Sequence, residues 1–129
     1  MVRRESGEMG YNRHNAIIVT SYDEKKITEA QQKAETILSD LVSPIIESRC
    51  NNFMTFFVAP DGSKEGWSDS DIGDIQRNLF TKWLDEQRYD DNSTSIDWVE
   101  VQYGDDNYET KIIRDGDTHI RGNANAQST

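Results

Sequence analysis

The side chains in this sequence that could do chemistry are mainly carboxylates, and they gather in its second half. Residues 61–117 hold 16 acidic and 6 basic side chains, a net charge of −10, whereas residues 1–60 hold 8 acidic and 7 basic ones. The candidates lie on a predicted helix, in the loop after it and at a predicted hairpin tip: Asp69, Asp71, Asp74, Asp85, Glu86, Asp90, Asp91, Asp105 and Asp106. Carboxylates spaced along a helix and adjoining loops can imitate nucleic-acid phosphates and occupy a basic groove of another protein. The alternative is a charged surface that only keeps the domain soluble.

The patterns needed for metal binding or covalent catalysis are incomplete. Residues 69–74 (DSDIGD) begin like a calcium-binding EF-hand loop, but aspartate stands at the sixth position and phenylalanine at the twelfth, where glycine and glutamate are needed. His14 and His119 lie near opposite ends of the chain. Cys50 has no second cysteine and no histidine base in the predicted core. We therefore expect no metal, no cofactor and no catalytic residue.

A second candidate contact point is the connection over residues 59–67 (APDGSKEGW). It lacks the GxxxxGK spacing and the strand-to-helix placement of a phosphate-binding loop. Trp67 either folds back on the following helix as a hydrophobic staple or, together with Lys64, frames a small-ligand pocket or partner contact.

The elements that must position these side chains follow from the hydrophobic pattern. Strands are predicted over residues 16–21, 45–48, 53–58, 96–103 and 108–114. One helix is predicted from a capping box of Ser21 and Glu24 up to Pro44, and a second from an N-cap at Ser68 to about Arg88. This order, β-α-β-β-α-β with an extra C-terminal strand, predicts a ferredoxin-like α+β two-layer sandwich. We expect a flexible leader over residues 1–13, a single domain over 14–114 and a disordered tail over 115–129.

Side-chain periodicity predicts which faces are covered. The second helix has one apolar pattern, which we expect to face the sheet and to leave the acidic residues in water: Ile72, Ile75, Leu79, Phe80, Trp83 and Leu84. Two helices cover only one face of such a sheet. Alternation along the strands predicts that Phe57 and Trp98 belong to an aromatic patch on the open face. That patch is a candidate dimer or partner surface, unless the leader or tail covers it or the aromatic residues are simply core.

Composition limits the partners and the compartment. A sequence pI near 4.5 argues against direct binding to nucleic acid or to anionic membranes. A single cysteine fits a reducing compartment. The sequence has no apolar run of transmembrane length, and residues 1–10 lack the apolar core of a secretory signal. We expect a cytoplasmic protein.

Three segments together resemble the small uncharacterised acidic proteins of tailed bacteriophages and prophages. They are residues 14–21 (HNAIIVTS), 59–67 (APDGSKEGW) and 95–106 (SIDWVEVQYGDD), and the likeness covers roughly residues 9–114. The resemblance carries no catalytic motif. It implies that the protein binds and blocks a host protein, as anti-CRISPR and anti-restriction inhibitors do.

Two functions follow from these observations. The first is an inhibitor whose acidic residues occlude the nucleic-acid-binding site of a host defence protein or another nucleic-acid-handling protein. The second is a homodimeric structural or small-ligand-binding domain that pairs through the open sheet face. An enzyme is the third and least supported class, because no catalytic constellation is found in the sequence.

Overall fold

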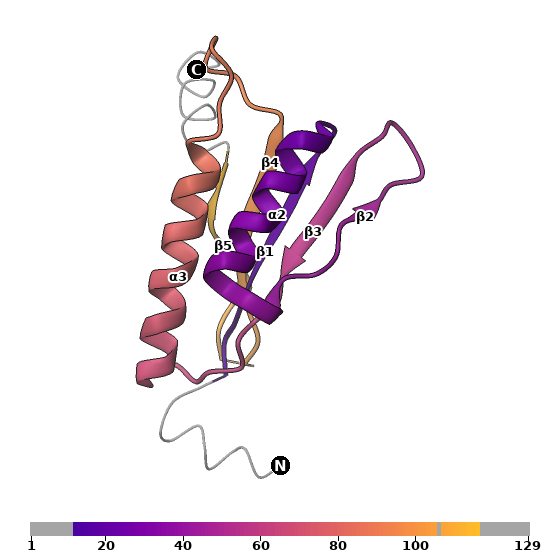
Figure 1. Ribbon diagram of the computed structural model, residues 1–129. Coiled ribbons are helices and arrows are strands. Elements are labelled where there is room, and N and C mark those ends of the chain that lie inside the picture. The colour runs from indigo at the N-terminus through magenta and orange to yellow at the C-terminus, as the bar shows by residue number, and fades with distance from the viewer. Residues whose placement is uncertain (1–11, 106, 117–129) are drawn as a thin grey trace, which may run out of the picture.

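The computed structural model describes residues 12–105 and 107–116, which form one sheet and two α-helices (Figure 1). The elements in chain order are β1 (His14–Ser21), α2 (Glu24–Leu38), the 3-10 helix η1 (Ser39–Leu41), β2 (Ile46–Glu47), β3 (Met54–Val58), α3 (Ser68–Asp85), β4 (Ile96–Tyr103) and β5 (Lys111–Asp115). Both helices lie over the same face of the sheet. The prediction of an α+β domain is confirmed.

The sheet has five antiparallel strands in the order β2-β3-β1-β4-β5. β1 is the central strand: its residue Ile18 lies opposite Phe57 of β3 on one side and Val99 of β4 on the other. The turn between β2 and β3 contains Asn51 and Asn52, whose φ angles of 62° and 57° are left-handed. Asparagine tolerates this backbone region better than most residues. Both predicted hairpins are therefore present.

The core lies between the sheet and the helices. It takes alternate residues from the three central strands, because successive side chains of a strand point to opposite faces. On α2 the predicted spacing of three and four residues is confirmed as the buried face. The buried apolar residues of these elements are Ile17, Val19, Ile27, Ala30, Ala34, Leu38, Phe56, Val58, Ile96 and Trp98.

The two ends of α2 differ from the prediction. The N-cap is Asp23, whose Oδ1 accepts a hydrogen bond from the backbone N of Lys26 at 3.1 Å, so the predicted capping box is wrong. Ser21 instead accepts a bond from the backbone N of Asp23 at 3.0 Å. The helix ends at Leu38, before the proline predicted to end it, because Ser39 has a φ of 55° and the chain continues as a 3-10 turn.

Residues at both predicted domain boundaries belong to the folded part. Arg13 is buried, and its guanidinium donates hydrogen bonds to the carbonyl oxygens of Gly104 and, at 2.6 Å, of Glu109. At the other end the backbone N of Gly116 donates to the carbonyl oxygen of Trp98 at 3.0 Å. Residues 1–11 and 117–129 lie outside the described residues, so the leader and the tail stay predictions.

Candidate protein-binding surfaces

The outer face of α3 is the first candidate surface, and it carries apolar residues that the sequence pattern places in the core. Ile72, Ile75 and Leu79 are 53%, 61% and 55% exposed, so the prediction that they pack on the sheet is wrong. Phe80 and Leu84, from the same pattern, are buried. Because Ile75 and Leu79 follow Ile72 by three and seven residues, the three side chains form one row along the helix. We call them the α3 stripe.

A buried ion-pair cluster explains why α3 faces this way. The side chain of Arg77 is 6% exposed and occupies the sheet-facing side of the helix, where its Nε lies 3.3 Å from Oε2 of Glu100 on β4. On β5, Nε of Arg114 lies 2.7 Å from Oε1 of the same carboxylate. A buried carboxylate is tolerated only when opposite charge compensates its lost hydration. Turning the α3 stripe toward the sheet would take Arg77 away and leave Glu100 with Arg114 alone.

Asp61 and Gly73 complete the cluster from the loop before α3. Asp61 Oδ2 lies 3.6 Å from Nη1 of Arg77, and a Cβ atom at Gly73 would collide with this oxygen. Burial raises the pKa of the Asp61 carboxyl, but hydrogen bonds from the Ser63 hydroxyl and backbone N, with the charge of Arg77, outweigh it and lower the pKa overall. An ionised Asp61 therefore holds the loop against the helix.

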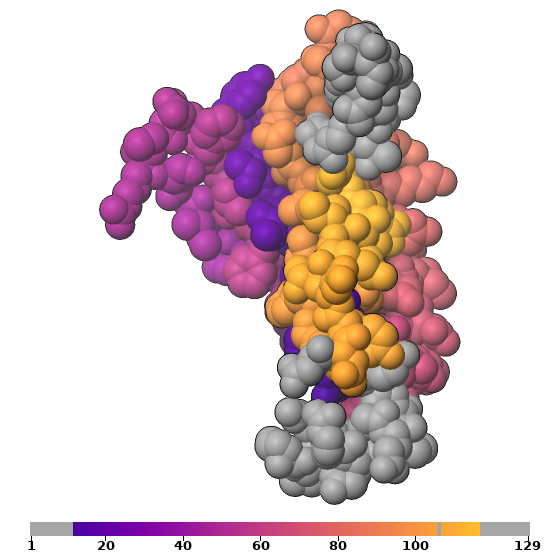
Figure 2. All heavy atoms as spheres, turned by 180° about the vertical axis from the view of Figure 1, so that it is seen from behind, coloured from indigo at the N-terminus to yellow at the C-terminus, as the bar shows by residue number. Residues whose placement is uncertain are grey.

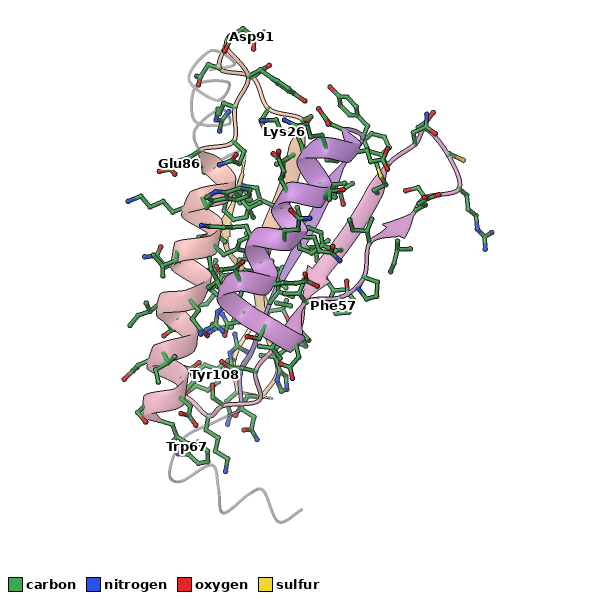
Figure 3. All side chains as sticks on the ribbon, viewed as in Figure 1. Lys26, Phe57, Trp67, Glu86, Asp91 and Tyr108 are labelled. Atoms are coloured by element: carbon green, nitrogen blue, oxygen red, sulfur yellow. The ribbon has the colours of Figure 1, made fainter. Side chains whose placement is uncertain are left out.

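The predicted acidic residues do not form one cluster. On and after α3 they form two groups near its two ends, which are roughly 20 Å apart at a rise of about 1.5 Å per residue. In Figure 3, Glu86 and Asp91 lie at one end of the molecule, and Trp67, which precedes the first turn of α3, lies at the other. The two groups are Asp69, Asp71 and Asp74, and Asp85, Glu86, Asp90 and Asp91.

Two of these carboxylates are already paired with arginine. Oδ1 of Asp74 lies 2.5 Å from Nη2 of Arg77, and Oδ1 of Asp85 lies 3.1 Å from Nη2 of Arg88. These two side chains offer a partner less negative charge than the sequence suggests.

Two further acidic residues organise their own turns. Asp91 accepts hydrogen bonds from the hydroxyl and the backbone N of Ser93, and these bonds hold the pKa of Asp91 below its ordinary value. Asp105 accepts from the backbone N of Asn107 at 3.0 Å in the β4–β5 hairpin. Asp106 lies outside the described residues.

The uncovered face of the sheet is the second candidate surface, and Trp98 is not part of it. Trp98 is 8% exposed and belongs to the core on the helix side, so its placement on the open face is wrong. Trp98 lies opposite the buried Val19 of β1, whereas the next residue, Val99, lies opposite Ile18 and points to the other face of the sheet. Phe57 lies opposite Ile18, and both are 42% exposed.

This surface runs across all five strands. Figure 2 shows it from behind, with β3, β1, β4 and β5 side by side and no described helix over them. We call the following residues, which share this side of the sheet, the open face: Ala16, Ile18, Thr20, Ile46, Thr55, Phe57, Val99, Val101, Tyr103 and Ile112.

The loop residues Lys64 and Trp67 contact each other. The Nζ atom of Lys64 lies 5.4 Å from the centre of the Trp67 ring, which is 44% exposed. Trp67, not Ser68, is the N-cap of α3, so it does not stand at the position before the cap that a hydrophobic staple requires. A shallow hollow of about 320 Å³ beside this ring reaches Asp69 and Ile72, so the loop and the α3 stripe form a continuous surface.

A hydrogen-bonded cluster lies where α2 begins, and no sequence motif indicates it. Tyr89 donates from its hydroxyl to Asp23 Oδ2 at 2.5 Å, and the same hydroxyl lies 2.9 Å from Oγ of Ser95. The Tyr89 bond, followed by the bond from the Lys26 backbone N, lowers the pKa of Asp23, and the Asp23 bond raises the pKa of Tyr89. Because Asp23 also caps α2, the cluster fastens the loop after α3 to that helix.

The described residues contain no group of three or more His, Cys, Asp and Glu side chains able to hold a metal ion. The His14 ring lies 5.3 Å from that of Tyr103, and Cys50 is exposed in the β2–β3 turn. His119 lies outside the described residues. No helix in the described part of the chain is long and apolar enough to cross a membrane.

Comparison of the chain with protein-family models, with curated proteins and with solved structures finds no significant match.

Proposed function

We propose that this protein acts by binding another protein, and that the outer face of α3 covers a basic surface that otherwise holds nucleic acid. The α3 stripe carries the proposal: three aliphatic side chains stand in water although Phe80 and Leu84 of the same helix are buried. Contiguous exposed apolar side chains with a polar rim are typical of interaction sites. Their spacing is that of helices that insert apolar anchors into a partner groove.

The acidic groups near the two ends of the helix give this surface its specificity. The exposed carboxylates of Asp69, Asp71 and Glu86 flank the α3 stripe. Acidic groups of this kind attract a basic surface and repel nucleic acid, so they select partners that have Lys and Arg beside an apolar groove. The apolar anchors then supply contact area that a row of carboxylates lacks.

The setting we propose is that of a phage-type inhibitor in the cytoplasm of a bacterial host. A net charge of −10 favours a basic partner over nucleic acid itself, and the free, exposed Cys50 fits a reducing compartment. The target would be a defence protein, as in anti-CRISPR and anti-restriction inhibition, or another nucleic-acid-handling protein. Inhibition is by occupancy, with one copy of the chain for each site, and needs no catalytic step.

We also propose that the domain is ferredoxin-like, with β5 as an added edge strand. The element order β-α-β-β-α-β and the strand order β2-β3-β1-β4 support this assignment, as does the placement of both helices on one face.

Charge-neutral substitution tests the acidic part of the surface. The immobilised chain is incubated with bacterial lysate at low salt, and captured proteins are identified by mass spectrometry. The test variant carries Asp69→Asn, Asp71→Asn, Glu86→Gln and Asp90→Asn. We expect this variant to capture at least tenfold less of any protein that binds DNA, because the four neutralised carboxylates supply the attraction to a basic surface. Circular dichroism checks that the variant stays folded.

The matched control changes four exposed acidic residues outside α3 and its following loop: Glu24→Gln, Glu35→Gln, Asp40→Asn and Glu47→Gln. It alters the net charge by the same amount, and we expect it to leave capture unchanged. Equal loss in both variants would mean that overall charge, not the α3 surface, drives binding. Unchanged capture in the test variant at low salt would reject the proposal.

A further inference from the structure

The open face differs from the rest of the surface in its lack of charge. Asp97 and Asp115 are the two strand residues on this side of the sheet that carry a formal charge. The chain as a whole has 24 acidic and 14 basic residues. The centre of the face is apolar, with Ile18 between Phe57 and Val99. Interface centres are depleted in charge and enriched in aromatic residues, whereas solvated surfaces are not.

From this composition we propose that the open face pairs with the open face of a second copy of the chain. A partner with a strongly charged surface would find little complementary charge here, because Asp97 and Asp115 are the two charged strand residues on this side. A second copy offers the same apolar residues, and face-to-face pairing keeps the two acidic α3 surfaces on the outside, where their repulsion is weakest. A two-fold dimer is the assembly in which one surface serves both partners.

The size of the face fits a weak, concentration-dependent pairing. Strands lie about 4.8 Å apart and rise about 3.3 Å per residue. The four longer strands have eight, five, eight and five residues, so each face covers roughly 400 Å² of sheet. Two such faces cover about 800 Å² together, which is below the standard size of a stable interface and fits a weak dimer that forms as the concentration rises.

The dimer would have four layers, with the helices of each copy outermost. It does not rest on the proposed function, because the α3 stripe lies on the helix layer and the open face lies behind the sheet (Figures 1 and 2). If both proposals hold, each dimer presents two α3 surfaces and binds a multimeric target with avidity.

Sedimentation equilibrium of the full chain tests the proposal over a wide concentration range. We expect wild type to reach twice the 14.8 kDa of one chain. Phe57→Glu is expected to shift the mass to that of one chain. Ile112→Glu is expected to give the same shift. Ile112 is 61% exposed in the edge strand β5, so this substitution leaves the core intact. The matched control is Ile75→Glu on α3, also 61% exposed, which should leave the dimer intact.

Three results would overturn the inference. The first is a wild-type chain that stays at the mass of one copy at every concentration. The second is a dimer that survives Phe57→Glu and Ile112→Glu but is lost in Ile75→Glu, which would place the contact on α3. The third is a single-copy chain that dimerises only after residues 117–129 are removed, which would assign the open face to that segment.

Discussion

Arg77 of α3 and Glu100 of β4 form the ion pair that sets the orientation of the helix. Their side chains are 6% and 2% exposed, and Nε of Arg77 lies 3.3 Å from Oε2 of Glu100. The pair occupies the place where a row of aliphatic side chains would otherwise pack. Its consequence is that Ile72, Ile75 and Leu79 stand on the outer side of the helix, exposed to solvent.

Breaking this pair from one side is expected to destabilise the domain strongly. Arg77→Met leaves the buried carboxylate of Glu100 with Arg114 as its charged neighbour, and removing one partner of a buried pair costs about 3–5 kcal/mol. Adding Glu100→Leu removes the orphaned charge and should restore part of that loss. Urea unfolding of both single variants and the double variant measures the coupling. Strictly additive losses would show that the two residues act independently.

Gly73→Ala is expected to destabilise the domain despite the better helix propensity of alanine, which is worth about 1 kcal/mol. The added methyl group collides with the Asp61 carboxylate and displaces it from Arg77. In an Asp61→Ala background the collision with the carboxylate disappears and a close approach of 3.1 Å to Nη1 of Arg77 remains, so we expect the same glycine substitution to cost less. Thermal and urea unfolding of wild type, the two single variants and the double variant measure the stability of each. An equal effect of Gly73→Ala in both backgrounds would contradict the clash.

The Tyr89–Asp23 bond should appear in the pH dependence of stability. The folded pKa of Asp23 is lowered, so its contribution is present above the unfolded pKa, near the ordinary value of 3.8, and is lost as pH falls through the folded pKa. Tyr89→Phe is therefore expected to raise the pKa of Asp23 and to reduce stability at pH 7, but not at strongly acidic pH. NMR titration of the carboxyl carbon and urea unfolding measure both effects.

The control for that experiment is Tyr22→Phe, which removes a hydroxyl from an exposed ring. We expect it to leave the titration of Asp23 close to that of wild type. A loss of stability in Tyr89→Phe that persists unchanged at strongly acidic pH would point to the lost contact of the same hydroxyl with Ser95, not to its bond with Asp23.

Salt is expected to affect the two surfaces in opposite directions. Screening weakens attraction between the acidic α3 surface and a basic partner, and it also weakens repulsion between two copies of a chain of net charge −10. Capture of the basic partner should fall with salt while self-association rises. Sedimentation and pull-down at the same salt concentrations compare the two. A parallel fall of both would contradict the assignment of separate surfaces.

Local patterns were sufficient to predict most elements of the fold. The periodicity of Ile27, Ala30 and Ala34 identified the buried face of α2, and the asparagine turn identified a hairpin. These features depend on residues close together in the sequence. The pairing of β1 with both β3 and β4 depends on contacts far apart in the chain, which local patterns do not indicate.

The face of α3 could not be predicted from apolar spacing alone. Its apolar residues span too wide an arc for all to be buried, since residues one position apart differ by about 100° around a helix. The structure buries Phe80 and Leu84 together with Arg77, because Arg77 forms an ion pair with the buried Glu100 of β4. In the same way Trp98 was assigned to the wrong side, since alternation does not say which set of β4 faces the helices. A charged residue within the helix pattern and a glutamate within a strand were the available signals.

The most direct test of the α3 surface is displacement of DNA from a captured, purified DNA-binding protein. A labelled duplex bound to that protein is titrated with the wild-type chain, with Ile75→Ser plus Leu79→Ser, and with Phe57→Ser as the matched change on the open face. We predict that wild type and Phe57→Ser release the duplex, whereas the α3 variant needs at least tenfold more protein, because two apolar anchors are lost. Equal release by all three chains, or a complex holding DNA and the chain together, would contradict the proposed function.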